Sequence, residues 1–249
     1  MGCLDMKWLI AVLGLITFTN VNAFSRVPDV PEDMPNWRVG YAMSTLYPVK
    51  VTQAYGVNDS RGWTSFIQLD MHFMTRTQLE KVREYYPNYD GFSISLGMHV
   101  PPKRQVMATN VFPDSVYIYW SSVTNQSFFA TKFDLTPKMK TVMSTKEPFT
   151  RFDGFKTHCY RSDIVFGFLP NGNTKVWLDG CGEYKFVTEL EPVEELDMDT
   201  FGNDAEIIRD NYSEDMAERA KQLGATLDPI PWDKVNKVYS SDEITKLEP

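Results

Sequence analysis

The chain has 249 residues, a formal net charge of −8 and a hydrophobic content of 43%. An acidic chain is a poor partner for nucleic acids and for anionic membrane surfaces, so we expect it to bind neither. Its apolar and aromatic content is large enough to bury a real core, which excludes an intrinsically disordered protein.

Residues 1–23 have the layout of a cleavable secretory signal peptide. Lys7 gives a positive start, residues 9–18 (LIAVLGLITF) form an apolar run, and Ala23 is the small residue that a signal peptidase reads. The apolar run is shorter than the ~20 residues that a membrane-spanning helix needs. We therefore expect cleavage after Ala23 and a soluble periplasmic protein that begins at Phe24, with an uncleaved N-terminal anchor as the alternative.

Short strand-like runs dominate the mature chain, and turn-forming residues separate them. The runs are rich in β-branched and aromatic residues, and the clearest alternation places Ile67, Leu69 and Met71 on one face. The expected strands cover residues 37–42, 49–57, 66–73, 92–100, 115–121, 127–135, 163–169 and 174–179.

Two helices are expected. Residues 77–80 (TQLE) match a capping box, and Pro87 ends the short helix that follows. Ser213 can cap a second and longer helix over residues 213–223, and Gly224 suits the position after its last turn.

These elements predict a mainly β (α+β) fold, namely an antiparallel β-sandwich-like domain with one or two helices, the main one C-terminal. Residues 24–249 contain no convincing linker, internal repeat or low-complexity block. We therefore expect a single exported domain with an acidic, helical C-terminal portion.

Cys159 and Cys181 are the two cysteines that remain after signal cleavage, and an even pair in an exported chain indicates a disulfide. Asn171-Gly172, between two strand-like runs, predicts a tight hairpin that brings the two sulfurs close. Two buried free thiols are the alternative.

Catalytic signatures are mostly absent from the sequence. It has no nucleophile elbow, phosphate-binding glycine loop, dinucleotide fingerprint or His-Glu-x-x-His motif, and its three histidines are not spaced as metal ligands usually are. We therefore expect no catalytic residues, no metal and no cofactor.

Three weaker arrangements are open to a catalytic interpretation, although a structural one is favoured for each. An Asp–His pair shares one strand face, two glutamates share another, and a histidine stands next to a cysteine that the disulfide would occupy. These residues are Asp70 and His72, Glu189 and Glu191, and His158 beside Cys159.

Tryptophans and an acidic run are the features with binding character. Trp120 and Trp177 lie inside strong strand runs and are expected in the core, although exposed tryptophans could line a sugar-binding platform. Residues 189–218 hold twelve acidic residues and one base, which is typical of a solvated face but would also attract a basic partner. The expected partner contacts are Glu194, Glu195, Asp197, Asp199 and Asp204.

Five stretches occur together in the order NWRVGYA, YP, GW, VYIYWS and FLPNGNTKVWLDGC, at residues 36–42, 47–48, 62–63, 116–121 and 168–181. In this combination the chain, from about residue 37 to 224, resembles the bacterial DUF2931 family of small exported proteins and lipoproteins. The motifs are structural, and the chain departs from the lipoproteins because no cysteine stands directly after its apolar run.

The resemblance implies a function by context, since relatives of this type often resemble envelope immunity proteins that accompany antibacterial type VI secretion effectors, notably lipases. We therefore expect a periplasmic inhibitor that binds and neutralises such an effector, a lipase or phospholipase, without stable membrane insertion. The alternatives are an envelope hydrolase that uses Asp70 and His72 or the C-terminal carboxylates, and a glycan-binding or structural envelope module.

Overall fold

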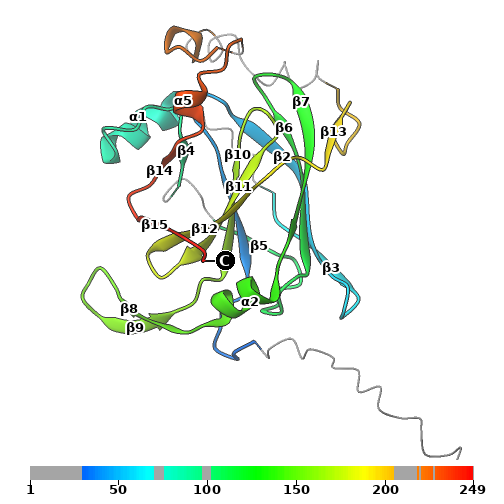
Figure 1. Ribbon diagram of the computed structural model, residues 1–249, viewed down its shortest axis with the longest axis vertical. Coiled ribbons are helices and arrows are strands. Elements are labelled where there is room, and N and C mark those ends of the chain that lie inside the picture. The colour runs from blue at the N-terminus through cyan, green and yellow to red at the C-terminus, as the bar shows by residue number, and fades with distance from the viewer. Residues whose placement is uncertain are drawn as a thin grey trace, which may run out of the picture.

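The computed structural model describes residues 30–69, 76–96, 102–204, 218, 220–226 and 228–248, and in this part the protein is mainly β, as predicted (Figure 1). Two large sheets pack against each other. Helices are few and short. The expected signal peptide, residues 1–23, lies outside the described residues.

The first sheet has six strands in the order β15-β12-β11-β10-β1-β5. Strand β1 runs parallel to β10, and β15 runs parallel to β12. This sheet is therefore mixed, whereas the sequence predicted an antiparallel, sandwich-like domain; parallel neighbours are possible here because only strands joined by a short hairpin are forced to run in opposite directions. The strands are β1 (Arg38–Ala42), β5 (Lys103–Arg104), β10 (Asp163–Phe168), β11 (Thr174–Gly180), β12 (Glu183–Leu190) and β15 (Glu243–Lys246).

The second sheet has five strands in the order β13-β7-β6-β2-β3, and all neighbours are antiparallel. Two small ribbons accompany the large sheets. The strands of the second sheet are β2 (Val49–Asn58), β3 (Trp63–Phe66), β6 (Ser115–Ser122), β7 (Ser127–Asp134) and β13 (Glu194–Leu196). The ribbons pair β4 (Ile94–Ser95) with β14 (Val238–Tyr239) and β8 (Glu147–Thr150) with β9 (Lys156–Cys159).

The described helices are α1 (Arg76–Tyr85), α2 (Pro137–Ser144) and α5 (Trp232–Val235). Helix α1 ends before Pro87, as predicted. Helix α2 was not predicted, although its start carries a readable signal: the Thr136 side chain accepts a hydrogen bond from the Met139 amide, and Pro137 occupies the first turn.

The expected main helix over residues 213–223 falls largely outside the described residues. Residues 218 and 220–222 are helical, and Gly224 has φ +88°, which suits the end of a helix. The longest helices in the described part are α1 and α2, so a main helix at the C-terminal end is not shown and stays a prediction.

Two predicted strands are shorter than expected or shifted. Strand β3 begins at Trp63 and ends at Phe66, because it completes a hairpin with β2, and Ile67 follows it as an isolated bridge to Gln105. The strand expected over residues 92–100 is reduced to β4. Residues 70–73 and 97–100 lie outside the described ranges.

The first core lies between the two large sheets and draws residues from both, such as Ile118 of β6 and Phe166 of β10. Trp120 is buried there, as predicted, and its ring centroid lies 4.8 Å from that of Phe129 and 4.7 Å from that of Phe168. Phe129 belongs to the same sheet as Trp120, whereas Phe168 belongs to β10, so the contact with Phe168 holds the two sheets face to face.

The second core covers the opposite face of the first sheet. Trp177 of β11 and Val165 of β10 pack there with Leu79 of α1 and Val235 of α5. Gly167 makes room for this packing, because a Cβ at that position would lie 2.7 Å from the Trp177 ring. The described part is thus three layers thick, and the first sheet is the middle layer.

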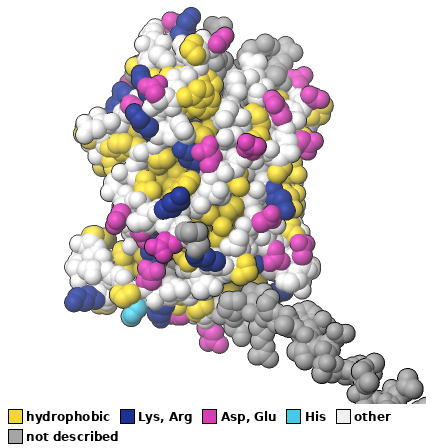
Figure 2. All heavy atoms as spheres, in the orientation of Figure 1, with side chains coloured by type: hydrophobic (Ala, Val, Ile, Leu, Met, Phe, Trp, Pro, Cys, Tyr) yellow, Lys and Arg dark blue, Asp and Glu magenta, His cyan; other side chains and the backbone are white. Residues whose placement is uncertain are grey.

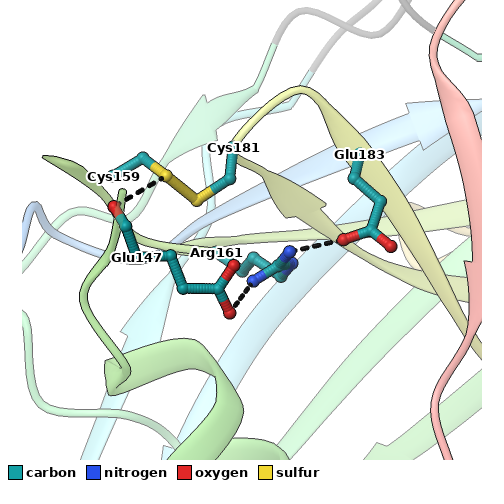
Figure 3. Close-up of a disulfide and its surroundings, with 5 residues drawn as sticks. All are labelled: Glu147, Cys159, Arg161, Cys181 and Glu183. Carbon is teal, nitrogen blue, oxygen red and sulfur yellow. Dashed lines mark hydrogen bonds and ion pairs between the residues drawn. A yellow bond between two sulfur atoms is a disulfide. The ribbon is translucent and has the colours of Figure 1, made fainter. Parts of the chain in front are cut away.

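Cys159 at the end of β9 and Cys181 in the turn between β11 and β12 form a disulfide, with their Cα atoms 5.4 Å apart (Figure 3). The pairing predicted from the sequence is confirmed. Cys181 and Gly182 have φ of +63° and +74°, as a two-residue type I′ hairpin turn requires. Gly180 allows the close approach, since a Cβ there would collide with the carbonyl oxygen of Tyr160.

A buried arginine reinforces the same junction. The Arg161 side chain is 4% exposed and forms ion pairs with Glu147 of β8, at 2.5 Å, and with Glu183 of β12 (Figure 3). The base of the β8–β9 hairpin is therefore joined to the first sheet both covalently and by charge.

Replacing Cys159 and Cys181 together by serine should lower the free energy of unfolding by about 2–4 kcal/mol, because the cross-link spans 22 positions and restricts the unfolded chain. Urea denaturation without reductant measures the change. Wild-type protein with reductant is the control and should unfold at the midpoint of the variant. An unchanged midpoint for the variant would contradict this account.

Candidate functional site

Aromatic side chains gather on the outer face of the second sheet. Tyr55 of β2 lies directly opposite Phe66 of β3 and Tyr117 of β6 in the strand register, so the three side chains share this face. The Tyr55 ring stacks on Tyr117 at 5.2 Å and lies 6.1 Å from Phe66 and 6.3 Å from Tyr119. We call Tyr55, Phe66, Tyr117 and Tyr119 the aromatic face.

Period-two alternation explains why these residues point outward. On β2 and β6 the neighbouring Ala54 and Ile118 are buried in the first core, so Tyr55 and Tyr117 take the other side of the sheet. Burial among the rings, followed by a hydrogen bond to Tyr119, raises the pKa of Tyr55 to about 12. The Tyr55 side chain is therefore a neutral hydroxyl group at physiological pH.

A cavity of about 290 Å³ adjoins the aromatic face. Residues 52–54 of β2 form one wall, Phe66 and Leu69 another, and Phe201 reaches in from the C-terminal side. Phe66 is 54% exposed and Phe201 is 68% exposed. Large apolar side chains that are exposed together around a hollow are typical of a contact surface for another molecule.

The acidic residues predicted to contact a partner begin on β13, the edge strand of this same sheet. Glu194, Glu195, Asp197 and Asp204 are exposed, and we call them the acidic segment. Within the described ranges, none of the first three forms an ion pair. In the space-filling view, acidic side chains gather on the side of the molecule where β13 lies (Figure 2).

Asp199, which the sequence grouped with these contacts, is buried and has a different role. Its carboxylate accepts hydrogen bonds from the Phe201 and Asn203 amides and from Asn203 Nδ2, each at 2.8 Å. The side chain therefore closes the loop over residues 199–203 and fixes the backbone that carries Phe201.

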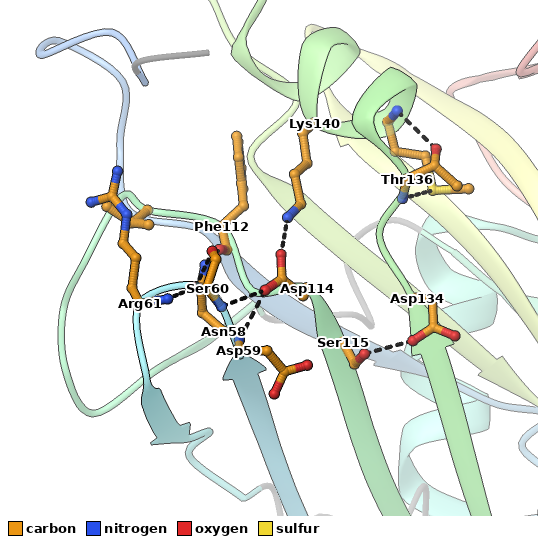
Figure 4. A network of polar contacts seen from close by, with 12 residues as sticks. Asn58, Asp59, Ser60, Arg61, Phe112, Asp114, Ser115, Asp134, Thr136 and Lys140 are labelled. Carbon is orange, nitrogen blue, oxygen red and sulfur yellow. Dashed lines mark hydrogen bonds and ion pairs between the residues drawn. The ribbon is translucent and has the colours of Figure 1, made fainter. Parts of the chain in front are cut away.

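A polar network anchors the β2–β3 hairpin that carries Phe66 (Figure 4). Asp114 accepts a hydrogen bond from Lys140 of α2 at 2.5 Å and from the Asp59 amide at 2.9 Å. Asn58 donates to the Phe112 carbonyl at 2.8 Å. These bonds tie the hairpin tip to α2 and to the start of β6. The hairpin that carries Phe66 is therefore held in a defined position.

A second cavity, of about 430 Å³, is polar and lies beside the disulfide. Asp163 of β10 and Asp179 of β11 are directly opposite each other at its wall. Arg38 of β1 donates to both oxygens of Asp163, with Nε–Oδ1 at 2.8 Å and Nη2–Oδ2 at 2.6 Å. Burial and then the charges of Asp163 and Asp242 raise the pKa of Asp179 to about 7.

None of the three weaker catalytic arrangements predicted from the sequence is shown by the described residues to form a catalytic site. Asp70 and His72 lie outside the described residues. Glu189 accepts a hydrogen bond from Asn173 Nδ2 at 3.0 Å, and His158 adjoins a cysteine that the disulfide occupies. Trp177 is buried, as predicted, and so cannot line a sugar-binding platform.

The described ranges contain neither a helix that could span a membrane nor a cluster that could hold a metal ion. No helix among these residues is long and apolar enough to cross a membrane. No group of three or more His, Cys, Asp or Glu side chains in the same part of the chain is placed to share a metal ion.

Replacing Asp179 by asparagine should flatten the pH dependence of stability. The folded-state pKa, about 7, exceeds the ordinary 3.8, so the folded protein keeps a proton that the unfolded chain releases. Wild-type stability should therefore fall as pH rises from about 4 to 7, by at most ~1.4 kcal/mol per pH unit from this group.

Denaturation midpoints at several pH values measure this slope, with Asp233→Asn, an exposed aspartate on α5, as the matched control. The control should keep the wild-type slope. Equal slopes for Asp179→Asn and wild type would show that Asp179 does not hold the proton.

The comparisons with known proteins agree with the sequence resemblance. A family model described as "Protein of unknown function (DUF2931)" matches residues 25–233, which run from before β1 to the start of α5. Searches of curated proteins and of solved structures returned no match. Because the family match covers most of the chain, the protein belongs to the DUF2931 family.

Proposed function

We propose that this protein is an exported, periplasmic immunity protein that binds and neutralises an antibacterial type VI secretion effector with lipase or phospholipase activity. The observation that carries the proposal is the aromatic face, set on a fixed sheet next to an apolar cavity and the acidic segment. Inhibition by occlusion needs only a shaped surface. The effector class comes from the family resemblance.

Each part of this surface has a physical role in the proposal. Tyrosine and phenylalanine are effective anchors in protein interfaces, because they bury a large area and lose little conformational freedom. The exposed acids on β13 and after it would attract a basic rim on the effector and so speed the first encounter. Asp199 contributes indirectly, through the loop that presents Phe201.

A second candidate function, binding of a cell-envelope glycan, is favoured by one observation. Tyr55 and Tyr117 form a stacked pair on an open sheet face, and flat sugar rings stack on such platforms. Calorimetric titration with peptidoglycan fragments separates the candidates. Saturable binding that is lost in Tyr117→Ala would favour the glycan module over the inhibitor.

The direct test of the proposal is protection of a sensitive bacterium. A candidate lipase-like effector, identified by inspecting the genes next to that of this protein, is exported to the periplasm alone or together with this protein. Cells should survive only when the full chain is present, and not when residues 1–23 are deleted and the protein stays in the cytoplasm. Death of cells that contain normal amounts of exported protein would contradict the proposal.

The aromatic face should dominate the affinity. The double variant Tyr55→Ala and Tyr117→Ala should weaken binding to that toxin at least tenfold, because truncating a central anchor commonly costs about 2 kcal/mol. Surface plasmon resonance measures it. Tyr85→Ala, an exposed tyrosine on α1, is the matched control and should bind as wild type does. Equal affinity for the double variant would place the interface elsewhere.

The acidic segment should control the association rate. The triple variant Glu194→Gln, Glu195→Gln and Asp197→Asn should associate several-fold more slowly at low salt and dissociate at nearly the wild-type rate. The difference should shrink at 1 M salt, where the screening length falls to about 3 Å. Identical association rates at both salt concentrations would show that these acids are only a solvated face.

A further inference from the structure

The β8–β9 hairpin projects away from the two large sheets, at the lower left of Figure 1. Its tip, residues 151–155, exposes two large apolar side chains. Phe152 is 99% exposed, the highest fraction among the large apolar residues of the described ranges, and Phe155 is 62% exposed. Neither ring contributes to the two cores, so the fold does not require an aromatic residue at either position.

The tip is ordered by its own hydrogen bonds. The Arg151 amide donates to the Phe155 carbonyl at 2.9 Å, and the Gly154 amide donates to the Arg151 carbonyl at 2.9 Å. The Asp153 carboxylate accepts from the Phe155 amide at 3.1 Å. Gly154 has φ +81°, a left-handed conformation that glycine adopts without strain. Because the turn is already formed, little freedom is lost when it binds.

The base of the hairpin is held as firmly as its tip. The Cys159–Cys181 disulfide and the two ion pairs of Arg161 join it to the first sheet. In addition, the Tyr160 hydroxyl donates to Asp33 at 2.6 Å. A convex aromatic tip on a stapled hairpin has the shape and stiffness needed to enter a concave site.

The charges at and beside the tip favour a cleft in a protein, rather than a lipid surface, as the partner that the tip contacts. Arg151 pairs with Asp153 at 3.3 Å, and Lys156, which begins β9 directly after the tip, forms no ion pair among the described residues. Stable attachment to a membrane needs a second signal besides a small apolar group, such as a polybasic patch. One spare cation on a protein of net charge −8 does not supply it.

We propose that Phe152 and Phe155 enter the apolar substrate cleft of the effector and block access of its lipid substrate. The inference rests on the proposed function and adds the inhibitory element to it. An enzyme that accepts acyl chains has a cleft lined by apolar groups, and two phenyl rings on a preformed turn can displace water from such a cleft.

The test uses the full-length mature protein and the purified candidate effector. The double variant Phe152→Ser and Phe155→Ser should need at least ten times more protein than wild type for half-inhibition of ester hydrolysis. Its thermal midpoint should stay unchanged, because both side chains are exposed. The matched control is Val106→Ser with Met107→Ser, an exposed apolar pair on another loop. The control should inhibit as wild type does.

The outcomes separate this inference from the proposed function. Inhibition by wild type together with equal inhibition by the phenylalanine variant would overturn the inference and leave the immunity function standing. Failure of wild type to bind or inhibit the toxin would overturn both. Sedimentation of wild type, but not of the variant, with vesicles of phosphatidylethanolamine and phosphatidylglycerol would replace the protein cleft by a membrane and so overturn the inference.

Discussion

Strand β10 is the constraint on which the rest of the structure depends, because all six of its residues are buried. Phe166 faces the core between the two large sheets, whereas Val165 faces the core beneath α1. A strand with apolar contacts on both faces has to sit in the middle of a layered fold. Gly167 belongs to the same constraint, since only the absence of a side chain there lets Trp177 pack.

The surfaces available for binding follow from this arrangement. The first sheet is covered on both faces, so the second sheet is the large sheet that turns a face toward solvent, and alternation places its tyrosines there. The β8–β9 hairpin packs into neither core and is held at its base by the disulfide and Arg161. Both proposed contact surfaces are therefore supported by features that also stabilise the fold, and loss of binding has to be separated from loss of stability.

Much of the fold could be predicted from local pattern. The strands β2, β6, β7, β10 and β11, the Asn171-Gly172 turn and the cysteine pair all carry short-range signals, and each was found. The parallel pairing of β1 with β10 could not be read, because no local turn encodes it. In the candidate site, the role of the acidic run in partner contact stays a prediction, and the burial of Asp199 could not be read because its hydrogen bonds depend on the loop conformation. The aromatic face was missed although Tyr117 and Tyr119 alternate visibly, since burial of one sheet face has to be known first.

The central claim is that the protein neutralises an enzyme by stoichiometric occlusion. The most direct measurement is a titration of the purified candidate effector, at a concentration far above the dissociation constant, with its ester hydrolysis followed against added protein. The account predicts a linear loss of activity that ends at a fixed, small whole-number ratio and does not change with incubation time. Activity that persists at excess protein, or that declines with time at substoichiometric amounts, would contradict it.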